Sequence, residues 1–316
     1  MLQLLRLLAD GRFHSGEELG ALLGISRSAV WKQLQLLHEM TGLALFKVRG
    51  KGYRLEHPIS LLSPEVLCSQ LASLQLHIEE RVDSTNAMAM RLLARQEPPL
   101  LVLAEAQTAG RGRRGRQWCS PYGANLYFSL AIGIDRSATQ LQALSLVVGV
   151  AVLRVLRRAG VSDIGLKWPN DLLAGGKKIA GILLELSGDP ADICNVVIGV
   201  GINVNMLSGP DIDQAWTSIQ LETKRQVDRT ELAIALAEEF RCVLGLHRDE
   251  GFAAFHEEWE ANHLWQDREV RLISGVHAVA GIALGVTGDG ALRLQVNGEE
   301  QVFSGGELSL RLQHDS

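Results

Sequence analysis

Residues 110–118 read "GRGRRGRQW" and combine four arginines with three glycines in a chain of net charge −5. Glycines allow positive φ and a close approach of the backbone to a ligand, and guanidinium groups bind anions through paired N–H donors. The stretch lacks the GK[ST] of a phosphate-binding P-loop and does not match a dinucleotide fingerprint. From the loop alone three interpretations stay open: a clamp for a nucleic-acid backbone, a cradle for one small anion, or a solvated loop.

A second candidate motif is "GLKWPNDLLAGGKKIAGILLE" at residues 165–185. The pattern predicts a tight hairpin at "AGGKK" that returns into an apolar strand with Lys178 at its mouth. A lysine there either reaches water at a strand edge or points its ammonium group into a pocket. The nearby Asp171 could hold magnesium through oxygen, and Trp118 or Trp168 could stack on a flat ring.

Short polar side chains follow an expected strand in "VDSTN" at residues 82–86. Ser84 or Thr85 can cap the next helix, or these side chains and Asn86 can hydrogen-bond a neutral polar head group. The glycines of "GVGINVN" (199–205) leave room for a ligand against the sheet. No Ser-His-Asp set, metal cluster or carboxylate pair stands out in the sequence. This favours chemistry by positioning and charge neutralisation.

Mixed α/β periodicity at residues 61–267 predicts the central domain that positions these motifs. Strands are expected at 77–83, 100–105, 125–133, 163–167, 178–187 and 195–204, and helices at 85–96, 138–158, 229–246 and 252–262. From residue 268 onward, short strands are separated by the turn pairs Asp289-Gly290 and Asn297-Gly298. We therefore expect residues 268–316 to form a small Src-homology-3-like β-barrel.

Residues 1–60 predict a winged helix-turn-helix domain. Ser15 and Glu18 have the spacing of a capping box, Gly24 ends that helix, and Ser26 can cap a second one. Residues 43–55 predict two short strands around a basic glycine turn, which is the shape of a wing. The prolines and serines of residues 57–66 mark the best candidate linker.

The charge of this head favours a nucleic-acid partner. Residues 1–60 hold eight Lys/Arg against five Asp/Glu, so the remainder of the chain carries −8. Four polar residues of the second helix are placed to meet base edges: Arg27, Ser28, Lys32 and Gln33. Four basic residues of the hairpin are placed to reach phosphates: Lys47, Arg49, Lys51 and Arg54. The alternative is a protein-docking head with a solvated basic rim.

Composition sets further limits. With 47% hydrophobic residues, the chain can bury a substantial core. The four cysteines show no metal-binding spacing, which favours reduced thiols in the cytosol. The longest apolar run, 141–156, is too short to span a bilayer and contains Arg154. We expect a cytoplasmic protein without a membrane partner.

Taken in order, these motifs resemble those of the biotin–protein ligases. The resemblance rests on "DSTN", "AEAQTAGRGRRGRQW", "SPYGANLYFSL", "LKWPNDLL", "KKIAGILLE" and "IGVGINVN". The head, with "FHSGEELGALLGISRSAVWKQLQLL" and "GKGYRL", is similar to that of the bifunctional members, which also repress the biotin operon. The match covers essentially the whole chain.

The resemblance implies an enzyme that activates biotin with ATP and Mg²⁺ to biotinyl-5′-adenylate. Biotin would then pass to a lysine of the biotin carboxyl carrier protein of acetyl-CoA carboxylase. Carried over by motif, the biotin-binding residues are Ser84, Thr85, Asn86, Gln107, Arg111, Gly112, Arg113 and Lys178. The expected nucleotide-binding residues are Trp118, Asn170 and Lys178, the catalytic ones Lys178, Arg113 and Arg111, and the magnesium ligand Asp171.

The resemblance also implies a homodimer, formed when the adenylate is bound, that binds biotin operator DNA. Ordering of the arginine loop by the adenylate would link the two activities. Two alternatives are a ligase whose head no longer regulates and a DNA-binding regulator whose body only senses a ligand. A related ligase fold handles lipoate, but GRGRRG together with the winged head favours biotin.

Overall fold

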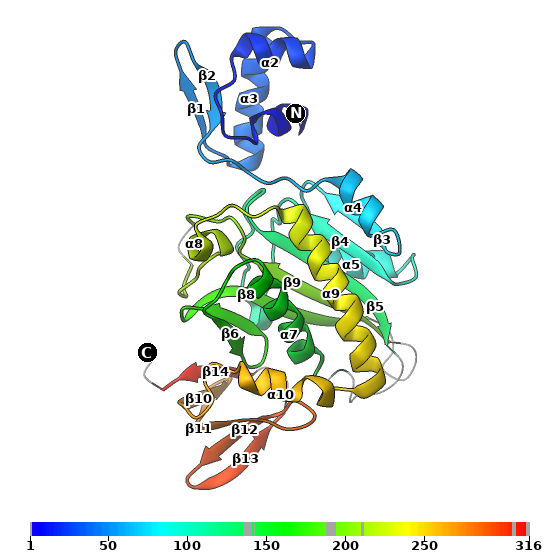
Figure 1. Cartoon of the computed structure of the whole chain (residues 1–316), viewed down its shortest axis with the longest axis vertical. Coiled ribbons are helices and arrows are strands. Elements are labelled where there is room, and N and C mark those ends of the chain that lie inside the picture. Colours follow the sequence, from blue (N-terminus) through cyan, green and yellow to red (C-terminus); the bar gives the residue numbers. More distant parts are fainter. Residues whose placement is uncertain are drawn as a thin grey trace.

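The computed structural model describes residues 2–134, 141, 143–187, 194–209, 212–304 and 308–313. Figure 1 shows a small head at one end, a central sheet with helices, and a second small sheet at the other end. The head comprises α1 (Leu2–Leu8), α2 (Gly16–Leu23), α3 (Arg27–Thr41) and the antiparallel pair β1 (Leu45–Val48) and β2 (Gly52–Leu55). This order confirms the predicted helix-turn-helix followed by a wing.

The helix ends in the head follow the sequence signals. Ser15 and Glu18 form both hydrogen bonds of the capping box, and Gly24 ends α2 at φ 66°. Ser26 caps α3 by accepting a hydrogen bond from the backbone N–H of Ala29. The linker is shorter than the predicted range of residues 57–66, because Ser63 caps another helix, α4 (Pro64–Gln70).

The central domain is built on a seven-stranded sheet in the order β3-β4-β5-β9-β8-β7-β6. The strands are β3 (Gln75–Glu79), β4 (Leu100–Ala104), β5 (Leu126–Ile134), β6 (Ile164–Lys167), β7 (Asp171–Ala174), β8 (Lys177–Ser187) and β9 (Cys194–Ile202). Only the pair β3–β4 is parallel among these neighbours. The predicted mixed sheet is therefore confirmed.

Helices cover both faces of this sheet. One face carries α5 (Thr85–Leu93), and the other carries α7 (Leu144–Arg158) and α9 (Arg229–Glu250). The domain also contains α8 (Ile219–Thr223) and α10 (Ala253–Ala261), and α10 packs on α7 and α9. Alternation along β4 places Leu101 and Leu103 in the core under α7 and α9, and Leu100 and Val102 in the core under α5. Residues 138–140 and 142 of the helix expected at 138–158 lie outside the described residues.

The C-terminal strands are β10 (Glu269–Ser274), β11 (His277–Val286), β12 (Leu292–Val296), β13 (Glu299–Phe303) and β14 (Leu308–Leu312). They form one antiparallel sheet in the order β13-β12-β11-β10-β14. Asn297 and Gly298 both have positive φ and make the predicted two-residue turn between β12 and β13. The described strands show no pairing that closes the sheet, so the predicted barrel is not confirmed.

Several contacts fix the head and the linker to the central domain. Tyr122 and Ala106 of the central domain belong to the same buried cluster as the apolar side chains of the head. The Arg229 guanidinium, fully buried, donates to the carbonyl of Ser60 and pairs with Glu105. Within the described segments, no helix has the length and hydropathy needed to cross a membrane.

Candidate active site

One pocket on the α5 side of the sheet brings together the predicted ligand-binding residues. Its lining includes Ser84, Thr85, Asn86, Gln107, Arg111, Gly112, Arg113, Trp118, Asn170 and Lys178. These residues come from the start of α5, from the segment after β4, from the arginine loop, and from the strands β7 and β8 with their connections. The fold therefore assembles motifs that are separated by more than 90 positions, such as Ser84 and Lys178.

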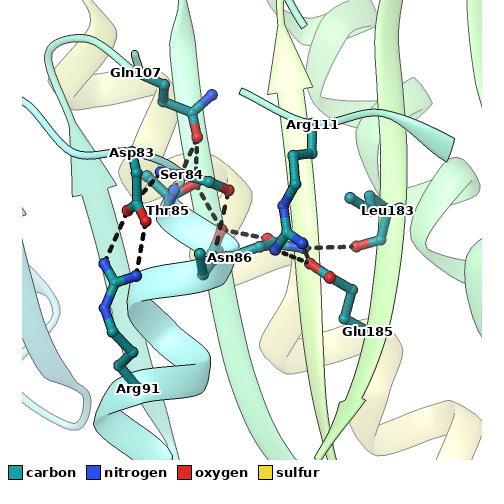
Figure 2. A network of polar contacts seen from close by, with 11 residues as sticks. Asp83, Ser84, Thr85, Asn86, Arg91, Gln107, Arg111, Leu183 and Glu185 are labelled. Atoms are coloured by element: carbon teal, nitrogen blue, oxygen red, sulfur yellow. Dashed lines mark hydrogen bonds and ion pairs between the residues drawn. The ribbon is translucent and has the colours of Figure 1, made fainter. Parts of the chain in front are cut away.

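Polar contacts organise the end of the pocket formed by residues 84–86 and Gln107, called the head-group end here (Figure 2). The Gln107 Oε1 atom accepts from the backbone N–H of Thr85 at 2.8 Å and from its hydroxyl at 3.1 Å. Ser84 caps α5, as one of the two interpretations of "DSTN" held. Arg91 pairs with Asp83 through both carboxylate oxygens and lowers the pKa of Asp83 to about 2. This pair fixes the turn that leads into Ser84.

Asn86 has partners within the protein. Its Nδ2 atom donates to the carbonyl of Leu183 at 3.2 Å and to Glu185 at 2.8 Å, and its Oδ1 atom lies 2.6 Å from the Ser129 hydroxyl. The side chain is 4% exposed. Asn86 therefore joins α5 to β8 and has little hydrogen-bonding capacity left for a ligand.

Lys178 lies at the other end of the pocket, which we call the reactive end. The register of β7 and β8 shifts next to Lys178, and such a bulge re-aims a side chain. The Lys178 Nζ atom lies 2.7 Å from Asp171 Oδ1 and 5.4 Å from the centroid of the Trp118 ring. Of the two interpretations of this lysine, the structure supports a cation aimed into a pocket.

Asp171 is surrounded by cations. Burial raises the pKa of this carboxyl, whereas the ammonium groups of Lys178 and Lys167 lower it. Together the two lysines outweigh burial, so the pKa of Asp171 lies below its usual value. Lys167 Nζ lies 3.6 Å from Asp171 Oδ2, and burial lowers the pKa of Lys167. Both carboxylate oxygens thus face lysines. Among the described residues, no group of three or more acids, cysteines and histidines can enclose a metal. These contacts do not form a magnesium site made of protein groups alone.

The arginine loop, residues 110–118, closes on itself over the pocket. Gly112 N donates to Arg116 O at 2.7 Å and Trp118 N donates to Gly110 O at 2.9 Å. The Arg113 guanidinium donates to Asn170 Oδ1 at 3.0 Å and to the carbonyl of Leu308 in β14 at 3.3 Å. The C-terminal sheet therefore contributes to the wall beside the loop.

The remaining loop arginines differ in their surroundings. Arg111 reaches β8, where it donates to Glu185 at 3.0 Å. Arg114 and Arg116 are exposed and line the cavity that adjoins the pocket. The loop is thus not a freely solvated segment.

The glycines of β9 and the two candidate tryptophans form the apolar part of the site. A Cβ atom on Gly199 would lie 2.2 Å from Asn86 Oδ1, and one on Gly201 would lie 2.4 Å from the Trp118 ring. These glycines therefore admit the side chains of Asn86 and Trp118 against the sheet. Both glycines also line the pocket, which is consistent with the predicted room for a ligand there. Trp168 is buried and donates its indole N–H to Gly290 O, so Trp118 is the indole that faces the pocket.

Sequence reasoning missed Glu185, Lys167 and the β14 backbone. The signal for Glu185 was its spacing of two and four residues from Leu183 and Gly181, which places all three on one face of β8. The contact with Leu308 joins positions 195 residues apart and left no signal in the sequence.

The predicted DNA-binding residues lie on one helix. Arg27, Ser28 and Lys32 are exposed on α3, whereas Gln33 is half-buried. The Lys47 ammonium group from the wing lies 4.5 Å from the centroid of the Trp31 ring on α3, a cation–π distance. This contact places a basic residue of the wing beside the exposed face of α3.

The pocket combines cationic side chains, a flat indole and a polar head-group end, which is typical of an enzyme that activates an anionic substrate. The helix-turn-helix head adds a DNA-binding module to this enzyme. Three family models match the chain: "HTH domain" at residues 1–54, "Biotin/lipoate A/B protein ligase family" at 78–203, and "Biotin protein ligase C terminal domain" at 267–311. The chain belongs to the biotin protein ligase family.

Relatives cover both the whole chain and its enzymatic part. The bifunctional ligase/repressor BirA of Escherichia coli is 41% identical over 98% of this chain and 97% of its own length. The biotin–[acetyl-CoA-carboxylase] ligase of Paracoccus denitrificans is 35% identical over 72% of this chain and 97% of its own. The solved biotin protein ligase from Aquifex aeolicus in complex with biotin and ATP has a TM-score of 0.68 and 30% identity, covering 76% of this chain and 99% of that one.

Proposed function

We propose that this chain is a biotin–[acetyl-CoA-carboxylase] ligase that also represses transcription of biotin-synthesis genes in the cytoplasm. One observation carries the ligase assignment: a single pocket holds Lys178, Arg111 and Arg113 beside a polar head-group end and the Trp118 ring. The names of the similar proteins supply the substrates, biotin and ATP, and the acceptor protein.

The first reaction step joins two anions. A carboxylate oxygen of biotin attacks the α-phosphorus of ATP, the bond between that phosphorus and the bridging oxygen breaks, and pyrophosphate leaves. Lys178 and Arg113 neutralise the charge that builds up as the two anions meet. Asp171 holds Lys178 in place beforehand, so little reorganisation is needed. Magnesium would enter with the phosphates and neutralise part of their charge.

The second step transfers the acyl group. The neutral ε-amine of a carrier lysine attacks the acyl carbon of biotinyl-5′-adenylate, AMP leaves, and the amine proton passes to solvent. No side chain of the pocket acts as a nucleophile in this scheme. We assign biotin binding to Ser84, Thr85, Gln107, Arg111, Gly112 and Arg113, and adenosine binding to Trp118 and Asn170. Asn86 supports the biotin site indirectly, through its hydrogen bonds to Leu183, Glu185 and Ser129.

A label-transfer assay tests the ligase assignment. With ATP, labelled biotin and a biotin carrier domain, the wild type should label the carrier. Lys178→Ala should lower the rate about 10²- to 10³-fold, the typical loss of one preorganised charge contact. Lys178→Arg keeps a partner for Asp171 and controls for folding, and Lys177→Ala removes the exposed neighbouring lysine. Normal transfer by Lys178→Ala would refute its role.

The head is assigned to operator binding, with Arg27, Ser28, Lys32 and Gln33 toward the bases. We propose that the adenylate-bound chain dimerises and that the dimer binds DNA. A gel shift on DNA upstream of biotin-synthesis genes should appear only with biotin and ATP. Lys32→Ala should weaken the shift and leave label transfer unchanged. An equal monomer fraction in sedimentation with and without the adenylate would contradict the dimer and leave the ligase intact.

We also propose domain limits of 1–60, 61–267 and 268–316, with the last domain folded as a small Src-homology-3-like barrel. The match of the helix-turn-helix model to residues 1–54 and of the C-terminal model to residues 267–311 supports these limits. Five antiparallel strands are sufficient for such a barrel.

A further inference from the structure

Glu185 lies on β8 where α5 and the arginine loop meet (Figure 2). Its Oε2 atom accepts from Asn86 Nδ2 at 2.8 Å and from the Arg111 guanidinium at 3.0 Å. The Glu185 side chain is 24% exposed and that of Arg111 is 46% exposed. One carboxylate oxygen therefore connects the sheet, the helix that begins at the head-group end, and the loop.

The position of Glu185 on the strand relates it to both ends of the pocket. Gly181, Leu183 and Glu185 share one face of β8 because strand side chains alternate. Gly181 lies under Lys178 and Trp118, and Leu183 lines the pocket. Glu185 is the next residue on this face and lies at the rim of the head-group end.

The contact between Glu185 and Arg111 reduces the electrostatic repulsion within the arginine loop. Four arginines within residues 111–116 repel one another, and this repulsion favours an open loop. Glu185 offsets one of these charges and does so at the strand over which the loop must close. The same carboxylate orients Asn86, whose second amide proton is bound by Leu183 O.

We propose that Glu185 is a positioning residue that latches the arginine loop to β8 and thereby retains biotin and biotinyl-adenylate in the pocket. The identity of the retained ligand rests on the proposed function, whereas the latch itself does not. Because Glu185 touches neither Lys178 nor Arg113 in the described contacts, its loss should affect retention more than the chemical step.

Two substitutions separate the contributions. Glu185→Gln keeps an acceptor for Asn86 and removes the charge opposite Arg111. Glu185→Ala also leaves a buried amide N–H of Asn86 without its partner, a larger loss. Glu300→Gln is the matched control, because Glu300 pairs with Arg293 on neighbouring strands of the C-terminal sheet.

Two measurements on the full-length protein test the latch. The first is the rate of trypsin cleavage within residues 111–116 without any ligand; we expect about a threefold increase in Glu185→Gln, the size of a partly exposed ion pair. The second is the label-transfer assay, in which the KM for biotin should rise about threefold in Glu185→Gln and about tenfold in Glu185→Ala, with kcat within twofold of wild type. Glu300→Gln should match wild type in both.

The outcomes distinguish the latch from the proposed function. Cleavage and KM at wild-type values in Glu185→Gln would overturn the latch, as would a fall in kcat with no change in KM. Faster cleavage of Glu185→Gln together with no label transfer by the wild type would support the latch and overturn the proposed function. Circular dichroism confirms folding, and if Glu185→Ala does not fold, Glu185→Gln alone decides.

Discussion

Arg229 offers the sharpest test of how the central domain is held together. Its side chain has no exposed surface, and its guanidinium donates to Glu105 and to the carbonyls of Ser60 and Asn125. Glu105 in turn accepts from the backbone N–H of Leu62 at 2.7 Å. The pair therefore joins the start of α9 to the end of β4 and to the linker.

The substitution Arg229→Leu would leave the Glu105 carboxylate buried without a cation. Breaking a buried pair in this way costs about 3–5 kcal/mol. At about 2–4 °C per kcal/mol for a domain of this size, the unfolding midpoint should fall by roughly 6–20 °C. Adding Glu105→Gln removes the uncompensated charge and should recover part of this loss, because a neutral amide costs less to bury.

Urea unfolding followed by circular dichroism measures the differences in free energy, and thermal unfolding measures the shift of the midpoint. The matched control is Arg91→Leu, which breaks the Asp83 pair, where the Arg91 side chain is 58% exposed. An exposed pair contributes at most about 1 kcal/mol. If Arg229→Leu destabilises the protein no more than Arg91→Leu, or if Glu105→Gln adds to the loss, the interpretation of this pair as a buried clamp is wrong.

Two further predictions concern the site and the interface with the C-terminal sheet. Gly201→Ala would place a Cβ atom 2.4 Å from Trp118 Cε2, so the indole should be displaced and the affinities for biotin and ATP should fall by about tenfold. The control Gly245→Ala adds a Cβ atom that meets no other atom within 4 Å, and its affinities should match those of the wild type. Equal affinities of Gly201→Ala and wild type in calorimetry would contradict the role of Gly201. Burial lowers the pKa of His263 to about 4 from 6.5. As the pH falls from 6.5 toward 4, His263 is protonated in the unfolded chain but stays neutral in the folded protein, so the folded protein becomes less stable. Between pH 7.5 and pH 5 the loss should be about 2 kcal/mol, and it should disappear in His263→Gln; an unchanged pH dependence in that variant would assign the effect elsewhere.

Local signals in the sequence predicted the helix caps, the two-residue turn and the set of pocket motifs. The capping box of Ser15 and Glu18 involves four residues, and its geometry follows from spacing alone. The role of Asn86 was not readable, because its partners on β8 lie about 97 to 99 residues away and depend on the register of the sheet. The choice between Trp118 and Trp168 likewise depended on packing, which buries Trp168 against the C-terminal sheet.

The contacts around Glu105 connect the linker to the pocket over a short path. Gln107 follows Glu105 by two residues and donates from Nε2 to the Ser120 hydroxyl at 2.9 Å, and Tyr122, two residues further on, packs in the core of the head. Spatial continuity is not in itself coupling, which requires an element whose equilibrium both sites bias. Arg229→Leu addresses this point, since it releases the linker without altering a residue of the pocket. If the head senses the ligand through this path, the variant should retain label transfer at a permissive temperature while its DNA binding no longer depends on biotin and ATP.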